Sequence, residues 1–284
     1  MDASDGAEIG GFKRRLMAGE PLIGTFIKTP TGHATEILGG VGFDFVIVDE
    51  EHAPFDRRTT DEVMVAARAS GIAALVRVAS SQSWHIQAAL DCGAAGVVVP
   101  HVTDAAGARE VVACCRYRGG RRGFSTTPRA GGYGAARAWD HVASQDAAVT
   151  VVAMIEDATA LDRLDEIAAV DGIDCLFVGR GDLMISMGQP AQDGAELEDA
   201  VLRIMAAAQK AGKPVCVMVG AIDETRNFLD RGATVFVLLS DQGLMRQTAV
   251  RSKNEFSRFA ASRRPESPEP GEPNQNGMER RIPR

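Results

Sequence analysis

The fold is indicated most clearly by the stretch Val46-Ile47-Val48-Asp49-Glu50-Glu51-His52-Ala53-Pro54. It begins with three β-branched apolar residues, which is typical of a strand buried on both faces of a parallel sheet. It then changes abruptly to three carboxylates, a histidine and a proline. In an α/β barrel the active site lies at the carboxyl ends of the strands, so this strand end would bring acid and base groups to the substrate. The alternative is an ordinary turn before the next helix, because aspartate and proline are also turn residues.

The same alternation of buried strand and helix continues along the chain. Eight strands are expected, at Leu22–Ile27, Phe45–Val48, Ala74–Val78, Gly96–Pro100, Val149–Ile155, Cys175–Val178, Val215–Val219 and Val235–Leu239. Helical periodicity is found between or after them, at Asp61–Ala69, Trp84–Leu90, Ala105–Cys115, Ala160–Ala169, Leu197–Ala211, Glu224–Asp230 and Gln242–Phe259. The alternation predicts a single α/β domain, a (β/α)8 TIM barrel. An open doubly wound sheet is not favoured, because no G-x-G-x-x-G motif follows the first strand.

The expected barrel covers residues 21–262, with a short segment on either side. Residues 1–20 form a lead-in with a helical part at Gly11–Gly19, and residues 263–284 form a Pro-, Glu- and Arg-rich tail with little to bury, which we expect to be disordered. A long connection follows the fourth strand at Tyr117–Ala148 and is rich in arginine and glycine. It is either a solvated excursion or an arginine-lined mouth that attracts carboxylate substrates.

The amino-acid composition limits the kinds of molecule that this protein is expected to bind. The 284 residues are 45% hydrophobic and carry a net charge of -7, which does not suit binding to nucleic acid or to an anionic membrane. No apolar run approaches the roughly 20 residues of a membrane span, and the acidic start does not resemble a signal peptide. A cytoplasmic enzyme with a small-molecule substrate is therefore expected. The five cysteines form no C-x-x-C pair that would indicate a zinc site.

Polar residues lie in or directly after the carboxyl ends of six expected strands: Lys28, Asp49 to His52, Arg77 (within the third strand), His101, Glu156 and Asp182. Glu156 and Asp182 end neighbouring strands, so their carboxylates could share one cation. Oxygen ligands without a thiolate favour Mg²⁺ or Mn²⁺. The alternative for each carboxylate alone is an ordinary acid in the first turn of a helix.

Five motifs, in order along the chain, carry a resemblance to a known family. They are Asp49-x-Glu51-His52-Ala53-Pro54, Leu75-Val76-Arg77-Val78, Gln87-x-x-Leu90-Asp91-x-Gly93-Ala94-x-Gly96-Val97-x-Val99-Pro100, Ile155-Glu156 and Phe177-Val178-Gly179-x-x-Asp182-Leu183. With these motifs the chain resembles the HpcH/HpaI family of class II, metal-dependent 2-oxo acid aldolases. The resemblance implies a (β/α)8 barrel that uses a divalent metal, Mg²⁺ or Mn²⁺ and possibly Co²⁺. It also implies cleavage of a 4-hydroxy-2-oxo acid to pyruvate and an aldehyde.

The resemblance also implies roles for individual residues. Glu156 and Asp182 would be the metal ligands, and Gly181 with Asp182 would belong to the loop that holds the substrate carboxylate. His52 would transfer the proton, and Arg77 would stabilise the charge of the enolate. A carboxylate beside His52 would orient its ring and make it more basic; Asp49 and Glu51 are both close in sequence, and the resemblance favours Asp49.

Asp91 has a different position from the other expected site residues. The resemblance makes it a support for the histidine, yet it ends a helix that returns to the far side of the barrel. We therefore expect Asp91 to reach the site of a neighbouring subunit, in a homo-oligomer that by family resemblance is a hexamer. The alternative is a surface acid near a helix end.

Two departures from the family pattern put the choice of substrate in question. Arg180 stands where the family loop has proline, and Met154 stands where a glutamine is common. Several other activities stay open. They are a Schiff-base aldolase using Lys28, an oxaloacetate decarboxylase, a CoA-thioester lyase of the same superfamily, and a barrel that binds a small acid without turnover.

Overall fold

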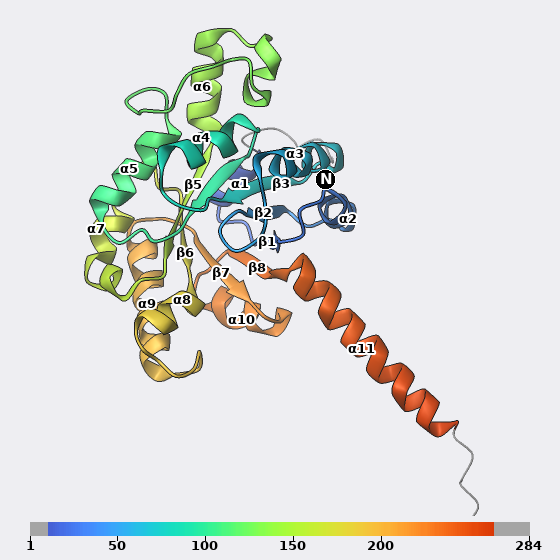
Figure 1. Cartoon of the computed structure of the whole chain (residues 1–284). Coiled ribbons are helices and arrows are strands. Elements are labelled where there is room, and N and C mark those ends of the chain that lie inside the picture. Colours follow the sequence, from blue (N-terminus) through green and yellow to red (C-terminus); the bar gives the residue numbers. More distant parts are fainter. Residues whose placement is uncertain (1–10, 264–284) are drawn as a thin grey trace, which may run out of the picture. The chain divides into compact units, whose positions relative to one another are not determined.

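The computed structural model describes residues 11–263, so the first ten residues and nearly all of the expected disordered tail lie outside it. Eight parallel strands close into a barrel in sequence order (Figure 1). They are β1 (Leu22–Ile27), β2 (Phe45–Asp49), β3 (Ala73–Arg77), β4 (Gly96–Val99), β5 (Thr150–Ile155), β6 (Cys175–Val178), β7 (Val215–Val219) and β8 (Val235–Ser240). The prediction of a single (β/α)8 barrel is confirmed.

Helices connect the strands and surround the barrel. They are α1 (Gly11–Met17), α2 (His33–Val41), α3 (Arg57–Ser70), α4 (Ser83–Asp91), α5 (Ala105–Cys115), α6 (Ala138–Ala148), α7 (Leu164–Ala168), α8 (Arg180–Ser186), α9 (Ala195–Lys210), α10 (Ile222–Asp230) and α11 (Asp241–Ser262), with 3-10 turns η1 (Arg129–Gly134) and η2 (Ala158–Arg163). The sequence analysis did not predict α2, α6 or α8. It also assigned one helix to Ala160–Ala169, where the structure has η2 followed by α7.

Successive side chains along each strand alternate between two hydrophobic cores, one inside the barrel and one between the barrel and its helices. In β2, Val46 and Val48 belong to the core between the barrel and its helices, whereas Phe45 and Ile47 belong to the core inside the barrel. Because side chains on a strand alternate between faces, Asp49 continues the inward series. The strand therefore ends with a carboxylate directed into the barrel.

Helix α1 contributes to the inner core next to the start of β2. Its Phe12 and Leu16 are buried with Leu22 and Phe45, and the ring centroids of Phe12 and Phe45 lie 5.2 Å apart. The ammonium group of Lys13 lies 3.0 Å from the carboxylate of Asp174. The lead-in segment thus packs on the amino-terminal end of the barrel, opposite the strand ends that carry the polar residues.

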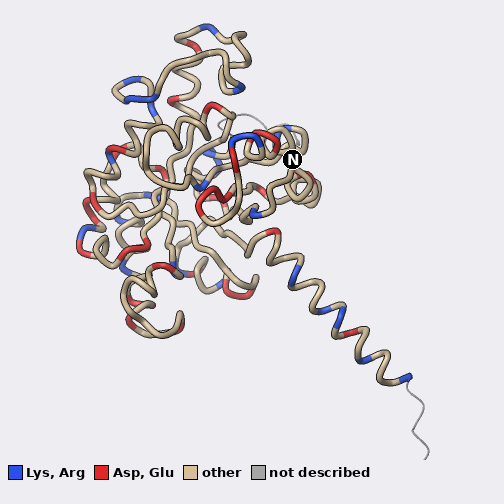
Figure 2. The backbone as a smooth tube through the Cα atoms, in the orientation of Figure 1, with Lys and Arg blue, Asp and Glu red and all other residues tan. Residues whose placement is uncertain are grey.

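The long connection after β4 is partly helical, because α6 lies within it. It packs against α4: the side chain of Arg129 lies beside Gly93, and Arg122 lies 3.7 Å from Asp91. Figure 2 shows basic residues along this connection, between the segments that Figure 1 labels α5 and α6. Arg122 and Arg129 are thus held against α4 on the outside of the barrel, whereas Arg118, Arg121 and Arg137 are exposed.

The chain divides into two compact units after Leu244, within α11. In the first unit, the buried Asp241 accepts hydrogen bonds from the backbone N–H groups of Lys28 and Thr29, which fixes the loop after β1. In the second, the helical residues include the exposed apolar side chains Met245, Val250, Phe256 and Phe259. No helix among residues 11–263 is long and apolar enough to cross a membrane.

Candidate active site

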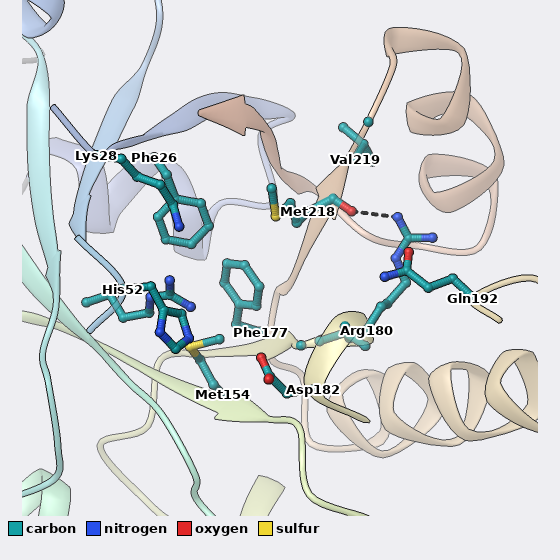
Figure 3. Close-up of a pocket in the computed structure, with 15 residues that line it drawn as sticks. Phe26, Lys28, His52, Met154, Phe177, Arg180, Asp182, Gln192, Met218 and Val219 are labelled. Atoms are coloured by element: carbon teal, nitrogen blue, oxygen red, sulfur yellow. Dashed lines mark hydrogen bonds between the residues drawn. The ribbon is translucent and has the colours of Figure 1, made fainter. Parts of the chain in front are cut away.

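A pocket of about 340 Å³ opens at the carboxyl ends of the strands (Figure 3). Its lining comes from the ends of β1, β2, β3, β5, β6 and β7 and from the loops that follow them. The lining residues are Phe26, Lys28, His52, Arg77, Met154, Phe177, Val178, Gly179, Arg180, Gly181, Asp182, Gln192, Met218, Val219 and Gly220. Four of the predicted site residues, His52, Arg77, Gly181 and Asp182, are therefore brought together. This is the position at which TIM barrels hold their active sites.

A buried ion pair lies beneath one side of the pocket. Asp49 and Arg77 are paired across β2 and β3, and the fully buried Asp49 carboxylate accepts hydrogen bonds from Nε and Nη2 of Arg77, at 2.9 and 2.7 Å. The ammonium group of Lys28 is 2.9 Å from the same carboxylate. Burial alone would raise the pKa of Asp49, but the hydrogen bonds and charge of Arg77, together with Lys28, lower it to about 2. Asp49 therefore remains ionised and holds both cations at the pocket.

His52 has a different carboxylate neighbour from the one favoured by the sequence analysis. Asp49 accepts a hydrogen bond from the backbone N–H of His52 at 3.1 Å and so shapes the turn after β2. The imidazole Nε2 instead lies 3.7 Å from Oε2 of Glu51, whose carboxylate is also 3.3 Å from Nη1 of Arg77. The expectation that Asp49 lies beside the histidine ring is thus corrected in favour of Glu51. The physical reason is that Arg77 and Lys28 already surround the Asp49 oxygens.

Glu156 lies at the end of β5, two residues beyond Met154 of the inner core. Its Oε1 accepts a hydrogen bond from the backbone N–H of His101 at 2.9 Å, and its Oε2 is buried without a hydrogen-bond partner. His101 adopts a left-handed conformation, with φ of 57°, that is uncommon outside glycine and concentrates at functional sites. The pKa of Glu156 is raised to about 7, mainly by burial and to a lesser degree by the charges of Glu51 and Asp182. The hydrogen bond and the charge of His101 act in the opposite direction and lower the pKa.

Asp182 lies in the first turn of α8, directly after β6. Its carboxylate faces the pocket in Figure 3, on the side of Met154 and Phe177. Gly179 lets this loop approach Glu156, since a Cβ atom there would lie 2.6 Å from the Glu156 Cβ and 2.7 Å from its Oε2. The β6–α8 loop therefore closes over the unpartnered oxygen of Glu156 and brings a second carboxylate to the same side of the pocket.

Comparison with known proteins places this arrangement in a family. The model of the HpcH/HpaI aldolase/citrate lyase family matches residues 22–248. The chain belongs to this family. The family assignment and the expectation of an aldolase made from the sequence are both confirmed.

Named relatives cover nearly the whole barrel. The chain is 35% identical to the 4-hydroxy-2-oxovalerate aldolase of Rhodococcus jostii over 89% of this chain and 98% of that one. It is 32% identical to the 5-keto-4-deoxy-D-glucarate aldolase of Klebsiella pneumoniae over 87% of this chain and 96% of that one. A crystal structure of a family protein from Burkholderia cenocepacia shares 29% identity with a TM-score of 0.84, covering 87% of this chain and 99% of that one.

The donor set of this HpcH/HpaI protein fits a divalent metal in part. Within residues 11–263 no three His, Cys, Asp or Glu side chains are arranged as a complete metal site. Glu156 nevertheless offers a buried oxygen that lacks a partner, and a buried polar atom in that state is costly unless a ligand satisfies it. Asp182 offers a second carboxylate. Two carboxylates completed by water and substrate are the usual protein share of an Mg²⁺ site.

Asp91 does not line this pocket. It ends α4, is 8% exposed, and its carboxylate lies 3.7 Å from the guanidinium of Arg122. The connection 117–148 also contributes no lining residue, so within one subunit it does not form the arginine-lined mouth considered from the sequence. A role for Asp91 in catalysis would need another copy of the chain.

The sequence analysis missed the apolar walls and the far end of the pocket. Phe26 and Phe177 are inward-facing strand residues that looked like ordinary core, and Arg77 lies over the Phe26 ring at 4.6 Å from its centroid. Gln192 comes from the loop between α8 and α9, where no motif marks it. Strand alternation could have identified the two phenylalanines, because each lies two residues before a position at the strand end.

Proposed function

We propose that this protein cleaves a 4-hydroxy-2-oxo acid into pyruvate and an aldehyde, as a divalent-metal-dependent aldolase. The observation that carries the proposal is that Asp182, Arg77 and His52 line one pocket, while the unpartnered buried oxygen of Glu156 lies directly behind Gly179 of its wall. The relatives support it, because their names are those of aldolases that act on oxo acids of this type.

The side chains have chemically distinct tasks in this proposal. His52 takes the proton of the 4-hydroxyl group, the bond between C3 and C4 breaks, the aldehyde leaves, and the electron pair stays on C3 as the enolate of pyruvate. Arg77, fixed by Asp49, lies where it stabilises the negative charge of that enolate. A proton delivered to C3 then gives pyruvate.

Glu156 and Asp182 are the residues that would hold the metal, Mg²⁺ or Mn²⁺ and possibly Co²⁺. When bound, a divalent ion would supply positive charge next to the 2-oxo group and the carboxylate of the substrate. The backbone of Gly181 and Asp182 would bind that carboxylate. A Schiff-base mechanism through Lys28 is not favoured, because the ammonium group of Lys28 is paired with buried Asp49 and an amine must lose its proton to attack a carbonyl.

Our proposal also includes a cytoplasmic homo-oligomer, of which a hexamer is the form implied by family resemblance. Asp91 is 8% exposed and does not line the pocket of its own subunit. Its carboxylate lies 3.7 Å from the guanidinium of Arg122, which stacks over the Tyr117 ring. A surface hollow beside this pair is lined by the exposed aromatic side chains Phe124 and Trp139. We propose that a second copy covers this region and that Asp91 then acts at that copy's His52. Mixing inactive His52→Ala and Asp91→Ala subunits tests this directly. Recovery of turnover is expected, whereas two variants that stay inactive when mixed would contradict a shared site.

The function is tested by measuring pyruvate release from several 4-hydroxy-2-oxo acids and from oxaloacetate, with Mg²⁺, Mn²⁺ or Co²⁺. Turnover that stops with EDTA and returns with metal is expected, and borohydride should not trap a substrate on the protein. Release of pyruvate from oxaloacetate alone would instead favour a decarboxylase. Trapping on Lys28 would favour the Schiff-base mechanism.

A further inference from the structure

Lys28 is the first residue after β1, and its backbone is held in place by a buried carboxylate. Asp241 accepts hydrogen bonds from the backbone N–H groups of Lys28 and Thr29, at 2.9 and 3.1 Å. The side chain of Lys28 lines the pocket, and its ammonium group lies 2.9 Å from Oδ2 of Asp49 and 6.0 Å from the centroid of the Phe26 ring. Both the backbone and the charged group of this lysine are therefore fixed at the pocket.

The ammonium group of Lys28 keeps hydrogen-bond donors for a ligand. It has three N–H donors, and the Asp49 carboxylate is its one hydrogen-bond partner among residues 11–263. Arg77 differs, because its Nε and Nη2 donate to Asp49 and its Nη1 lies 3.3 Å from Glu51. The side chain of Lys28 is also 26% exposed, against 7% for Arg77. Lys28 therefore has N–H donors left for an oxygen atom of the substrate.

The place of Lys28 in the barrel relates it to one half of the substrate. In the closed barrel β1 pairs with β2 and β8 and lies opposite β5, the strand that Glu156 follows. Figure 3 shows that Lys28 and His52 extend into the pocket from the same side, and Asp182 from a different side. With the 2-oxo acid group at Glu156 and Asp182, as in the proposed function, the rest of the substrate extends towards Lys28. The 4-hydroxyl group, whose proton His52 takes, then lies next to the ammonium group.

A cation beside this hydroxyl group has a defined effect on the reaction. Negative charge develops on O4 when its proton passes to His52, and the charge disappears as the bond between C4 and O4 becomes the carbonyl of the aldehyde. An N–H donor fixed beside O4 stabilises that charge, as the donors of an oxyanion hole do. In the aldol direction the same donor polarises the carbonyl of the aldehyde. Lys28 keeps its own protons throughout, so the balance of atoms and electrons in the cleavage is unchanged.

We propose that Lys28 is a further catalytic residue, whose ammonium group donates a hydrogen bond to O4 of the substrate, the atom that becomes the aldehyde oxygen. The inference rests on the proposed aldolase function and adds the group that acts on the aldehyde half. Asp49 then holds two cations with different targets: Arg77 stabilises the enolate, and Lys28 stabilises O4. One buried carboxylate thereby fixes the positions of both.

The test separates the two halves of the reaction in Lys28→Met, which removes the ammonium group and keeps most of the length of the side chain. Cleavage of a 4-hydroxy-2-oxo acid, and condensation of pyruvate with the corresponding aldehyde, should lose roughly 10²- to 10³-fold in kcat, the usual effect of removing one oxyanion donor. Exchange of the pyruvate methyl protons in D₂O, followed by NMR without an aldehyde, forms the same enolate and involves no O4. Its rate should change by less than about 3-fold.

A binding measurement provides a readout that does not depend on turnover. Oxalate is a planar dianion that resembles the enolate of pyruvate and has no counterpart of O4. Its Kd for Lys28→Met in the presence of Mn²⁺, measured by calorimetry, should stay within about 2-fold of the wild-type value. The enolate half of the site is then intact in the variant.

Further proteins test whether the ammonium group itself is responsible. Lys210→Met is the matched control, because Lys210 is also paired with a carboxylate, that of Asp165, but lies exposed on α9. It should keep the wild-type rates. Lys28→Cys should be as slow as Lys28→Met, and alkylation with 2-bromoethylamine, which rebuilds an amine of nearly the same length, should restore most of the lost cleavage rate. The five native cysteines are buried, so wild-type protein treated in the same way should keep its rate.

The outcomes that would contradict the proposal differ from one another. If exchange and oxalate binding fell as far as cleavage in Lys28→Met, Lys28 would only keep Asp49 and Arg77 in place, and the inference would be wrong. Wild-type cleavage rates in Lys28→Met, or trapping of the substrate on Lys28 by borohydride, would also overturn it. A wild-type enzyme that neither releases pyruvate in the cleavage assay nor exchanges the methyl protons of pyruvate would instead refute the proposed function, and this inference with it.

Discussion

Asp49 is fully buried and holds two cations, so its replacement affects both stability and activity. Asp49→Asn removes the charge while keeping the volume, and leaves Arg77 and Lys28 without their shared carboxylate. Breaking a buried pair in this way costs about 3–5 kcal/mol of unfolding free energy. Denaturant unfolding at neutral pH is expected to show this loss. A variant as stable as the wild type would show that the carboxylate is not needed to hold the two cations.

The lowered pKa of Asp49 makes this contribution depend on pH in a defined direction. The pKa of Asp49 in the folded protein, about 2, lies below its ordinary value of 3.8, so folding favours the ionised carboxylate. The stabilisation is complete above pH 3.8 and is lost as the pH falls towards 2. The difference in unfolding free energy between the wild type and Asp49→Asn should therefore be constant near neutrality and shrink in acid. A difference that grows on acidification would contradict this assignment.

The proposed metal ligands and the proposed base should respond differently to substitution. Glu156→Ala or Asp182→Ala is expected to abolish metal-dependent turnover and to weaken Mn²⁺ binding measured by calorimetry. His52→Ala is expected to bind Mn²⁺ normally and to slow turnover by roughly 10² to 10⁴. Normal rates in the carboxylate variants, or lost metal binding in His52→Ala, would show that these roles are assigned to the wrong side chains.

Residues at strand ends were predictable from sequence because strand alternation and barrel topology fix where they point. Asp49, Arg77 and Glu156 each continue an inward-facing series of apolar residues in β2, β3 and β5. The carboxylate beside the His52 ring was not predictable, because Asp49 and Glu51 both precede it closely in the sequence. Asp49 is excluded only by its ion pairs with Arg77 and Lys28, which form in the folded barrel. Sequence spacing does not encode such competition between neighbours.

At the scale of elements, the β6–α8 loop controls how closely the two carboxylates approach. Gly179 has an ordinary φ of -82°, so alanine would not strain the backbone, but its Cβ would lie 2.6 Å from that of Glu156. Gly179→Ala should therefore displace Glu156 and weaken Mn²⁺ binding by at least about 10-fold, as loss of ligand geometry does elsewhere. The matched control is Gly40→Ala in α2, where a Cβ atom meets nothing within 4 Å. Equal metal affinity in both variants would show that the loop tolerates the displacement.

Elements with a clear period were predicted well, and those without one were not. The eight strands lie within two residues of their predicted bounds because their apolar runs are bounded by glycine and polar residues. Helix α6 was missed because the arginine- and glycine-rich sequence before it suggested a continuous loop, although Ala138–Ala148 is helical. Helix α8 has seven residues, too few to show a helical period, and α2 contains two consecutive glycines that disfavour a helix prediction.

At the scale of the whole molecule, the residues of α1 that stabilise the inner core and the residues of the proposed active site lie at opposite ends of the barrel. Phe12 of α1 is 5% exposed and packs on Phe45 in the inner core, whereas the site residues follow the other ends of the strands. Phe12→Ala should lower the free energy of unfolding by about 3–5 kcal/mol, because it removes a buried ring and leaves a cavity. The exposed Phe256, in the second compact unit, provides a control substitution that creates no cavity within the barrel.

The same Phe12→Ala protein should bind Mn²⁺ normally and retain the KM of the folded enzyme at a temperature well below its unfolding transition. The physical reason is that the ion pairs of Asp49 and the hydrogen bond to Glu156 are made within the strand ends and do not pass through α1. Metal titration and steady-state kinetics beside a thermal melt measure both properties on one sample. If the metal affinity instead fell together with the stability, the packing of α1 at the amino-terminal end of the barrel would determine the positions of Glu156 and Asp182. The two ends of the barrel would then be energetically coupled.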